Sequence, residues 1–120
     1  MNYEWIDGFC MKMHGVTKDY KPEWDANRYF LGGKMFAMMA SNKEGRPIFT
    51  MKLEPPYGEL LRKQYPADIV PGYYMNKAHW NSLHLEGTVP NEVVEEMLRE
   101  SYQTMLKALP KKVQAELANG

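Results

Sequence analysis

The 120-residue chain holds 15 Lys and Arg and 15 Asp and Glu residues, so it has no net charge to attract a nucleic acid or a membrane surface. Its length predicts one domain, residues 1–120. A single cysteine excludes an intrachain disulfide, and the lack of a leader pattern or long apolar run predicts a cytoplasmic protein with no membrane partner. The charge is uneven, because residues 28–85 contain eight basic and only four acidic residues.

Apolar residues at helical spacing predict a first helix over residues 5–13, with Asn2 as its cap. Cys10 lies on the apolar stripe, where we expect a small buried side chain, because a catalytic thiol needs an exposed site beside a base. Residues 16–26 follow no regular pattern and predict no helix or strand. We expect Trp24 to anchor this segment to the core.

Three strands are predicted next, over residues 28–31, 34–40 and 48–53. A Gly-Gly pair at 32–33 predicts a tight turn, and 41–47 a longer one. These successive hairpins indicate an antiparallel sheet. The middle strand is apolar on both faces, so we expect both to be covered, whereas the third strand alternates and predicts one half-exposed face.

A short helix over residues 57–64 is predicted to turn Leu60 and Leu61 inward. A hairpin then follows, with strands over 69–74 and 79–85 joined by a polar turn. Alternation divides the return strand into two faces. The inward face carries Asn81, Leu83 and Leu85. The wetter face carries Trp80, Ser82 and His84.

The clearest helical stripe runs from Val93 to Leu109, and a last short helix is predicted after Pro110. The predicted order is helix, three strands, helix, two strands, helix and helix. Neighbouring strands that do not alternate strictly with helices indicate an α+β fold. We expect a single two-layer domain in which helices pack on an antiparallel sheet of about five strands.

The sequence carries no recognisable catalytic motif. His79 and His84 are an odd number of residues apart on one strand and face opposite sides, which argues against a metal site. The Gly-Gly-Lys sequence at 32–34 opens a strand and lacks the spacing of a phosphate loop. We therefore expect no catalytic residue, no cofactor, no metal and no enzymatic activity.

Several motifs closely resemble the MmcQ/YjbR family, in family order over nearly the whole chain. The most specific is the stretch from Pro71 to Asn81, Pro-Gly-Tyr-Tyr-Met-Asn-Lys-Ala-His-Trp-Asn. The others are Gly33-Lys-Met-Phe-Ala37, Met51-Lys-Leu53, Leu85-Glu-Gly-Thr-Val-Pro90 and Ser101-Tyr102. The resemblance implies an α+β fold like that of type III secretion chaperones. It also implies a double-wing arrangement like that of a phage transcription factor's DNA-binding domain.

The leading hypothesis is a DNA-binding domain that contacts duplex phosphates through basic residues on its sheet and hairpin turns. The phosphate contacts are assigned to Lys34, Lys52 and Lys77. Residues that shape or contact the site are His79, Trp80 and Asn81. Further candidates are Tyr73, Tyr74, Arg62, Lys63 and His84. With so few cations, DNA binding should be weak and salt-sensitive. The hypothesis requires the central cations to gather beside Trp80.

The alternative hypothesis is a protein-interaction module that uses the same face without nucleic acid, for which net neutrality is no handicap. An exposed apolar patch around Trp80 and Tyr74 would favour it. Structurally, Trp80 and the tyrosines can also be packed under a helix while the lysines are merely solvated.

Overall fold

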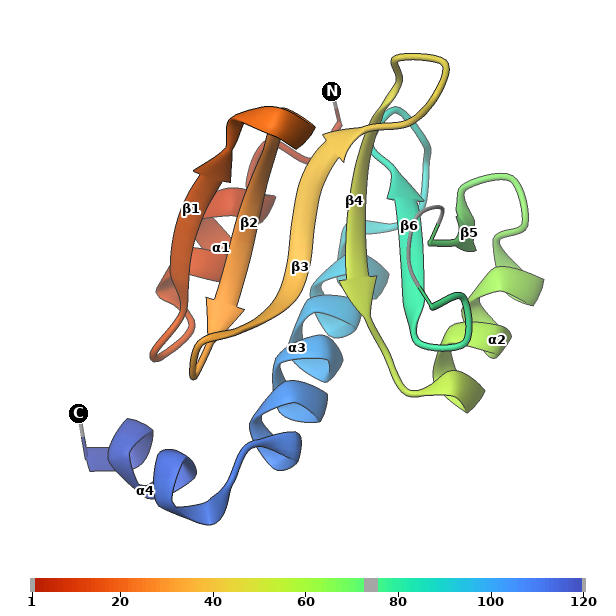
Figure 1. Cartoon of the computed structure of the whole chain (residues 1–120). Helices are drawn as coiled ribbons and strands as arrows, with labels where there is room; N and C mark the ends of the chain where they lie inside the picture. The colour runs from red at the N-terminus through yellow and green to blue at the C-terminus, as the bar shows by residue number, and fades with distance from the viewer. Residues whose placement is uncertain (1, 73–75, 120) are drawn as a thin grey trace.

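Alternating side chains and tight turns fold the first half of the chain into a continuous antiparallel meander (Figure 1). The structure is a computed structural model and describes residues 2–72 and 76–119. Gly32 and Gly33 have φ of +59° and +78°, the left-handed conformations that a two-residue hairpin turn requires. The strands of the meander are β1 (Thr17–Lys21), β2 (Ala26–Leu31), β3 (Lys34–Ser41) and β4 (Pro47–Lys52).

Two further strands complete a six-stranded sheet of order β1-β2-β3-β4-β6-β5. They are β5 (Ile69–Pro71) and β6 (Trp80–His84), and β6 pairs antiparallel with both β4 and β5. The hairpin prediction is confirmed for this pairing, and Asn81, Leu83 and Leu85 are all buried as expected.

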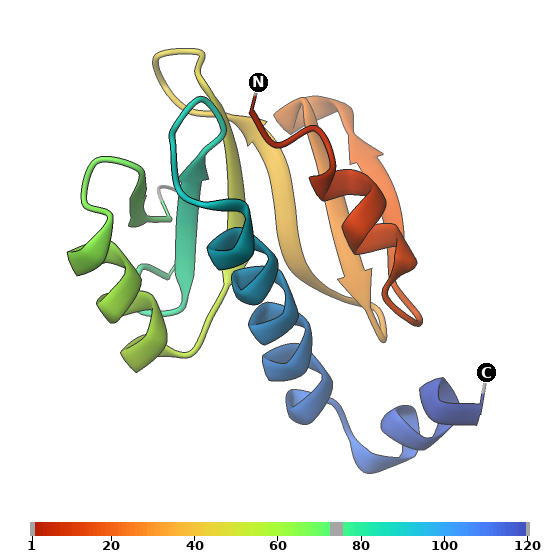
Figure 2. The same cartoon turned by 180° about the vertical axis from the view of Figure 1, so that it is seen from behind.

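Helices cover one face of the sheet, as Figure 2 shows for α1 and α3. The helices are α1 (Ile6–Lys12), α2 (Pro55–Gln64), α3 (Asn91–Ala108) and α4 (Lys111–Asn119), with a short 3-10 turn, η1, at Pro22–Trp24. The core between the layers joins Tyr29, Phe49 and Leu83 of the sheet to the apolar stripe of α3. No helix of the described residues lies on the opposite face (Figure 1), so the molecule has the two layers that were predicted.

The sheet has one strand more than the sequence predicted. β1 lies in the segment 16–26 that lacked a regular pattern, and it pairs with β2 along its whole length. Four of its five residues are exposed, because an edge strand at the rim of the helix layer has little apolar surface to bury. Pairing with β2, and not hydrophobic alternation, therefore defines this strand.

Trp24 does not anchor that segment to the core. Its side chain is 49% exposed in η1, beyond the edge of the core. The ammonium of Lys21 lies 4.2 Å from the indole centroid, and the guanidinium of Arg28 lies 5.7 Å from it. Trp24 is thus held at the surface by cations in place of apolar neighbours.

Asn2 does not cap α1, whose first turn follows Trp5 without a side-chain cap. The backbone amide of Asn2 donates to the carbonyl of Leu85 at 2.9 Å, and its side-chain amide donates to Gly87 at 2.8 Å. Leu60 is 59% exposed, so only Leu61 of the predicted pair faces inward. A helix of ten residues at the sheet's edge buries only a narrow stripe.

The apolar alternation of β3 is interrupted by a bulge. One extra residue of β3 lies between the pairs Tyr29–Ala37 and Phe30–Met35. As a result Phe36 and Ala37, although adjacent, are both fully buried. On the opposite face Met38 is buried and Met35 remains half-exposed, so the expectation that both faces of this strand are covered holds fully for the helix side and in part for the other.

Candidate nucleic-acid interface

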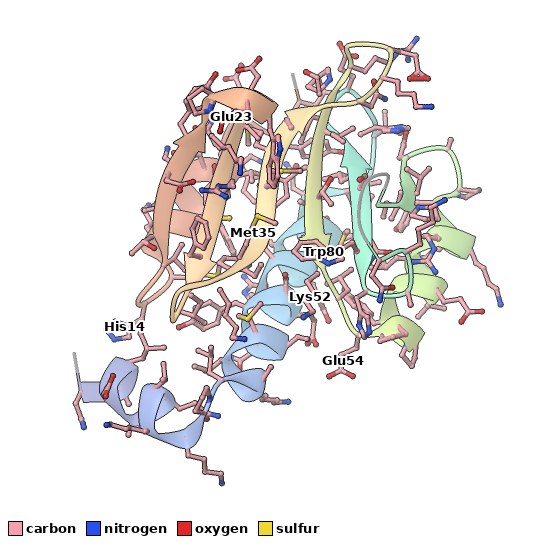
Figure 3. All side chains as sticks on the ribbon, viewed as in Figure 1. His14, Glu23, Met35, Lys52, Glu54 and Trp80 are labelled. Carbon is pink, nitrogen blue, oxygen red and sulfur yellow. The ribbon has the colours of Figure 1, made fainter. Side chains whose placement is uncertain are left out.

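The face of the sheet opposite α1 and α3, called here the open face, presents three cross-strand rows from β4 and β6. The register pairs Lys52 with Trp80, Thr50 with Ser82, and Ile48 with His84. Alternation turns all six side chains to the same side, away from buried Met51 and Leu83. Figure 3 shows Lys52 and Trp80 on this face, together with Met35 of β3.

The middle row forms the floor of the open face. Thr50 and Ser82 are only 3% and 2% exposed, and their hydroxyl oxygens lie 2.7 Å apart in a hydrogen bond. These short side chains lie between two rows of longer ones, of which Lys52, Trp80 and His84 are half-buried and Ile48 is buried. The middle of the open face is therefore a buried, hydrogen-bonded polar pair, and not a broad exposed apolar patch. The exposed large apolar side chains of the described residues lie elsewhere, at Met11, Tyr20, Trp24 and Leu60.

Lys52 and Lys77 are the predicted phosphate contacts that the structure places nearest to Trp80. Lys52 is directly opposite Trp80 and makes no ion pair with any described residue. Lys77 is exposed in the turn before β6, where Asn76 accepts hydrogen bonds from the amides of Ala78, His79 and Trp80. This confirms the polar turn expected around Asn76 and Lys77.

Lys34 belongs to the opposite side of the sheet. It pairs with Leu31, which faces the core, so alternation turns Lys34 toward the helix layer and not toward Trp80. Lys63 is in an i,i+4 ion pair with Glu59 at 3.6 Å. Two of the basic residues predicted to meet DNA are thus separated from the open face or engaged locally.

The remaining central cations also do not join one patch. Two side-chain nitrogens of Arg28 donate to the carboxylate of Asp19 at 2.8 and 2.5 Å, and the same hydrogen bonds lower the pKa of Asp19. Lys43 and Arg46 lie in the β3–β4 turn, at the opposite end of the strands from Lys52. The eight central cations therefore do not gather into one patch, and those that lie beside Trp80 are the local pair Lys52 and Lys77.

Asn81, predicted to contact DNA, lies inside the domain and links α2 to the sheet. It is completely buried, its side-chain oxygen accepts a hydrogen bond from Arg62, and its amide donates to the carbonyl of His79 at 3.2 Å. A Cβ on Gly58 would lie 2.9 Å from the Asn81 side chain, so α2 approaches β6 closely here. Asn81 and Arg62 together fasten α2 to the sheet, and neither points to the open face.

His84 is the last residue of β6, whereas His79 belongs to the turn that precedes the strand. The backbone carbonyl of His79 accepts a hydrogen bond from Leu53 at 2.7 Å and closes the end of the β4–β6 pairing. His84 lies on the open face, with its Nδ1 3.1 Å from the carbonyl oxygen of Ala67. Tyr73 and Tyr74 lie outside the described residues.

A pocket of about 320 Å³ opens beside His84, at the end of the open face away from Trp80. It is lined by Asn42, Lys43, Glu44, Ile48, Val70, Pro71, Ser82 and His84. Sequence reasoning singled out only His84 as a site residue among these. The others come from three separate segments, and the strand register that unites them leaves no local signal in the sequence.

Comparison with known proteins decides the family. The YjbR family model matches residues 11–104, well over half of the chain. The chain belongs to the YjbR family. It is 32% identical over 102 residues to the uncharacterized protein YjbR of Escherichia coli K12, with 85% of each chain covered. It is 31% identical to the uncharacterized protein YbdF of Escherichia coli O157:H7, with 84% of this chain and 80% of YbdF covered.

Solved structures with the YjbR fold agree with this assignment. A crystal structure of Deinococcus radiodurans protein DR2400, a DUF419 domain, matches with a TM-score of 0.86 at 28% identity and covers 98% of this chain and 88% of DR2400. A crystal structure of a Pseudomonas syringae protein matches with a TM-score of 0.72 at 20% identity, over 88% of this chain and 99% of that one. The second likeness is one of fold alone.

Two further features of the described residues concern a metal site and the single thiol. No three His, Cys, Asp or Glu side chains in residues 2–72 and 76–119 are placed to hold a metal ion. Burial raises the pKa of the Cys10 thiol to about 12, which keeps it protonated and unreactive. Within the same ranges, no helix has both the length and the apolar character needed to cross a bilayer.

Proposed function

We propose that this YjbR-family domain is a non-enzymatic, cytoplasmic DNA-binding module whose open face holds the DNA. The observation that carries the proposal is the row formed by Lys52 and Trp80, a cation and an aromatic ring opposite each other on a sheet face without a covering helix. The acidic residues of α3 lie in the other layer (Figure 2), so they do not neutralise this row.

The chemistry of the row suits a nucleic acid. Opposite residues of an antiparallel pair have Cβ atoms about 5 Å apart, so the ammonium group and the indole ring are presented together. A lysine contacts a phosphate as a point charge, while an aromatic ring stacks on a base or packs against a sugar. Lys77, three residues before Trp80, adds a second cation at the same end of β6.

The small number of available cations sets the expected salt dependence. With about two phosphates neutralised, by Lys52 and Lys77, log K should fall by roughly 1.4 to 1.8 for each tenfold increase in salt. Binding should therefore be detectable at low salt and weak at physiological salt.

Fluorescence anisotropy with labelled DNA at low and moderate salt tests the proposal. Lys52→Glu should abolish most of the binding. Lys34→Glu is the matched control, because it makes the same charge change on the helix side of the sheet and should weaken binding much less. Absence of binding to both duplex and single-stranded DNA at low salt would refute DNA binding.

The second candidate is a protein partner on the same face. It is favoured by Met35 and Trp80, two half-buried apolar side chains that no helix of the described residues covers. Affinity purification from the native cell with two variants separates the candidates. A partner lost with Trp80→Ala but kept with Lys52→Glu supports protein binding, whereas DNA binding lost with Lys52→Glu supports the first proposal.

A further inference from the structure

We propose that the pocket beside His84 receives one unstacked nucleobase, and that the DNA held by the open face is therefore single-stranded. This inference rests on the proposed DNA binding and specifies its substrate class. The pocket lies on the same face as Trp80, at the other end of β6, so one strand of DNA can reach both.

The size of the pocket matches a small ring system. Its volume of about 320 Å³ falls at the lower end of the range of small-molecule sites, roughly 300 to 1,000 Å³. A double helix, whose major groove alone is about 12 Å wide, cannot enter it. A single base that has left its stack can.

The lining of the pocket combines apolar side chains with hydrogen-bonding groups. Ile48, Val70 and Pro71 offer apolar surface to the faces of a ring. His84 and the side-chain NH2 of Asn42 offer polar atoms to its edge, since the Ser82 hydroxyl already bonds Thr50 and the Asn42 oxygen already accepts from the amides of residues 44 and 46. Lys43 and Glu44 add one charge of each sign, so the lining does not select a free anion. This combination suits a neutral heterocycle with donors and acceptors on its rim.

The tautomer of His84 follows from its neighbour. The carbonyl oxygen of Ala67, 3.1 Å from Nδ1, can only accept a hydrogen bond, so Nδ1 carries the hydrogen in the neutral ring. Nε2 is then the acceptor of the imidazole. A base presents amino or imino hydrogens that such an acceptor can bind.

Contacts at both ends of β6 require bases that have left their stack. Trp80 and His84 are four residues apart on one strand, a separation of about 13 Å. This separation equals about four steps of 3.4 Å along one strand of a duplex, but the bases of a duplex are paired and their edges are turned inward. A base on Trp80 and another in the pocket therefore require an unstacked single strand.

The test compares a short mixed-sequence DNA strand with the same strand annealed to its complement, by fluorescence anisotropy at low salt. Wild type should bind the single strand more tightly than the duplex. Val70→Trp fills the pocket and should weaken single-strand binding by about tenfold or more, with little effect on the duplex. Leu60→Trp adds the same ring at an exposed site on α2 and should leave both affinities unchanged.

The outcomes distinguish a failure of the pocket inference from a failure of the proposed DNA binding. If the wild-type duplex binds as tightly as the single strand, or if Val70→Trp binds the strand like wild type, the pocket inference is overturned while DNA binding stands. If neither DNA binds wild type, the proposed function itself fails. Should Val70→Trp not fold, as judged by circular dichroism, His84→Ala replaces it. This variant should weaken single-strand binding severalfold, and unchanged binding would overturn the inference.

Discussion

Removing the Ser82 hydroxyl from the floor of the open face should destabilise the domain, because the buried Thr50 hydroxyl loses its hydrogen-bond partner. The Thr50 and Ser82 oxygens are 2.7 Å apart, and both side chains are almost completely buried. Ser82→Ala deletes this hydrogen bond and leaves the Thr50 hydroxyl without its partner, at a cost of about 1–3 kcal/mol in the free energy of unfolding. Thr50→Val should cost a similar amount, because it leaves the buried Ser82 hydroxyl without its partner.

The double variant separates this explanation from a simple packing loss. With both hydroxyls gone, no buried polar group is orphaned, so Thr50→Val with Ser82→Ala should cost clearly less than the two single changes added together. Urea unfolding of wild type and all three variants measures the free energies, provided that the m-values stay equal. Ser41→Ala, at an exposed end of β3, is the control and should change stability by less than about 0.5 kcal/mol. Strictly additive single effects would refute the reasoning.

Three further predictions follow from the turns and the titratable groups. Gly32→Ala should destabilise the domain by about 1–3 kcal/mol in urea unfolding, because φ is +59° and the new Cβ would lie 2.7 Å from Leu109. Gly33→Ala, with similar φ but open space around it, should cost less, and equal losses would contradict the steric argument. Hydrogen bonds from Lys18 and Tyr29 lower the pKa of Asp7. Its carboxylate therefore stabilises the fold above the unfolded pKa of about 3.9, and this contribution is lost as the pH falls through the lower folded value. Asp7→Asn should thus be less stable than wild type at neutral pH, with a gap that narrows under acid; a gap independent of pH in urea midpoints would argue against the linkage. Cys10, buried and with its pKa raised to about 12, should resist a thiol reagent at pH 8 in the native protein and react in urea, and rapid native labelling would count against its burial.

The hairpin shows how far periodicity alone reaches. Alternation in residues 79–85 placed Asn81 and Leu83 on the inward face and Trp80 on the other, and the structure agrees, because a strand's side chains can only alternate. The long stripe of α3 was predicted for the same kind of reason. Local pattern also identified the α+β class, since two runs of strands separated by a helix cannot form a strictly parallel sheet.

Elements that depend on a partner were less predictable. β1 carries no apolar alternation, and its backbone is extended because β2 pairs with it. Leu60 looks as apolar as Leu61, but only one of the two falls on the side of α2 that meets the sheet. The bulge in β3 likewise shifted its side chains in a way that the run of methionines did not indicate.

For the candidate site, the sequence by itself determined which residue types were present, which side of β6 carries Trp80 and His84, and that Asn76 and Lys77 make a turn. Only the tertiary structure decided that Lys52 lies opposite Trp80, that Lys34 lies on the other side, and that a pocket opens at His84. The physical reason is register. A strand's own sequence sets the alternation of its side chains, but the neighbours that each side chain meets depend on how distant strands slide and pair within the whole sheet.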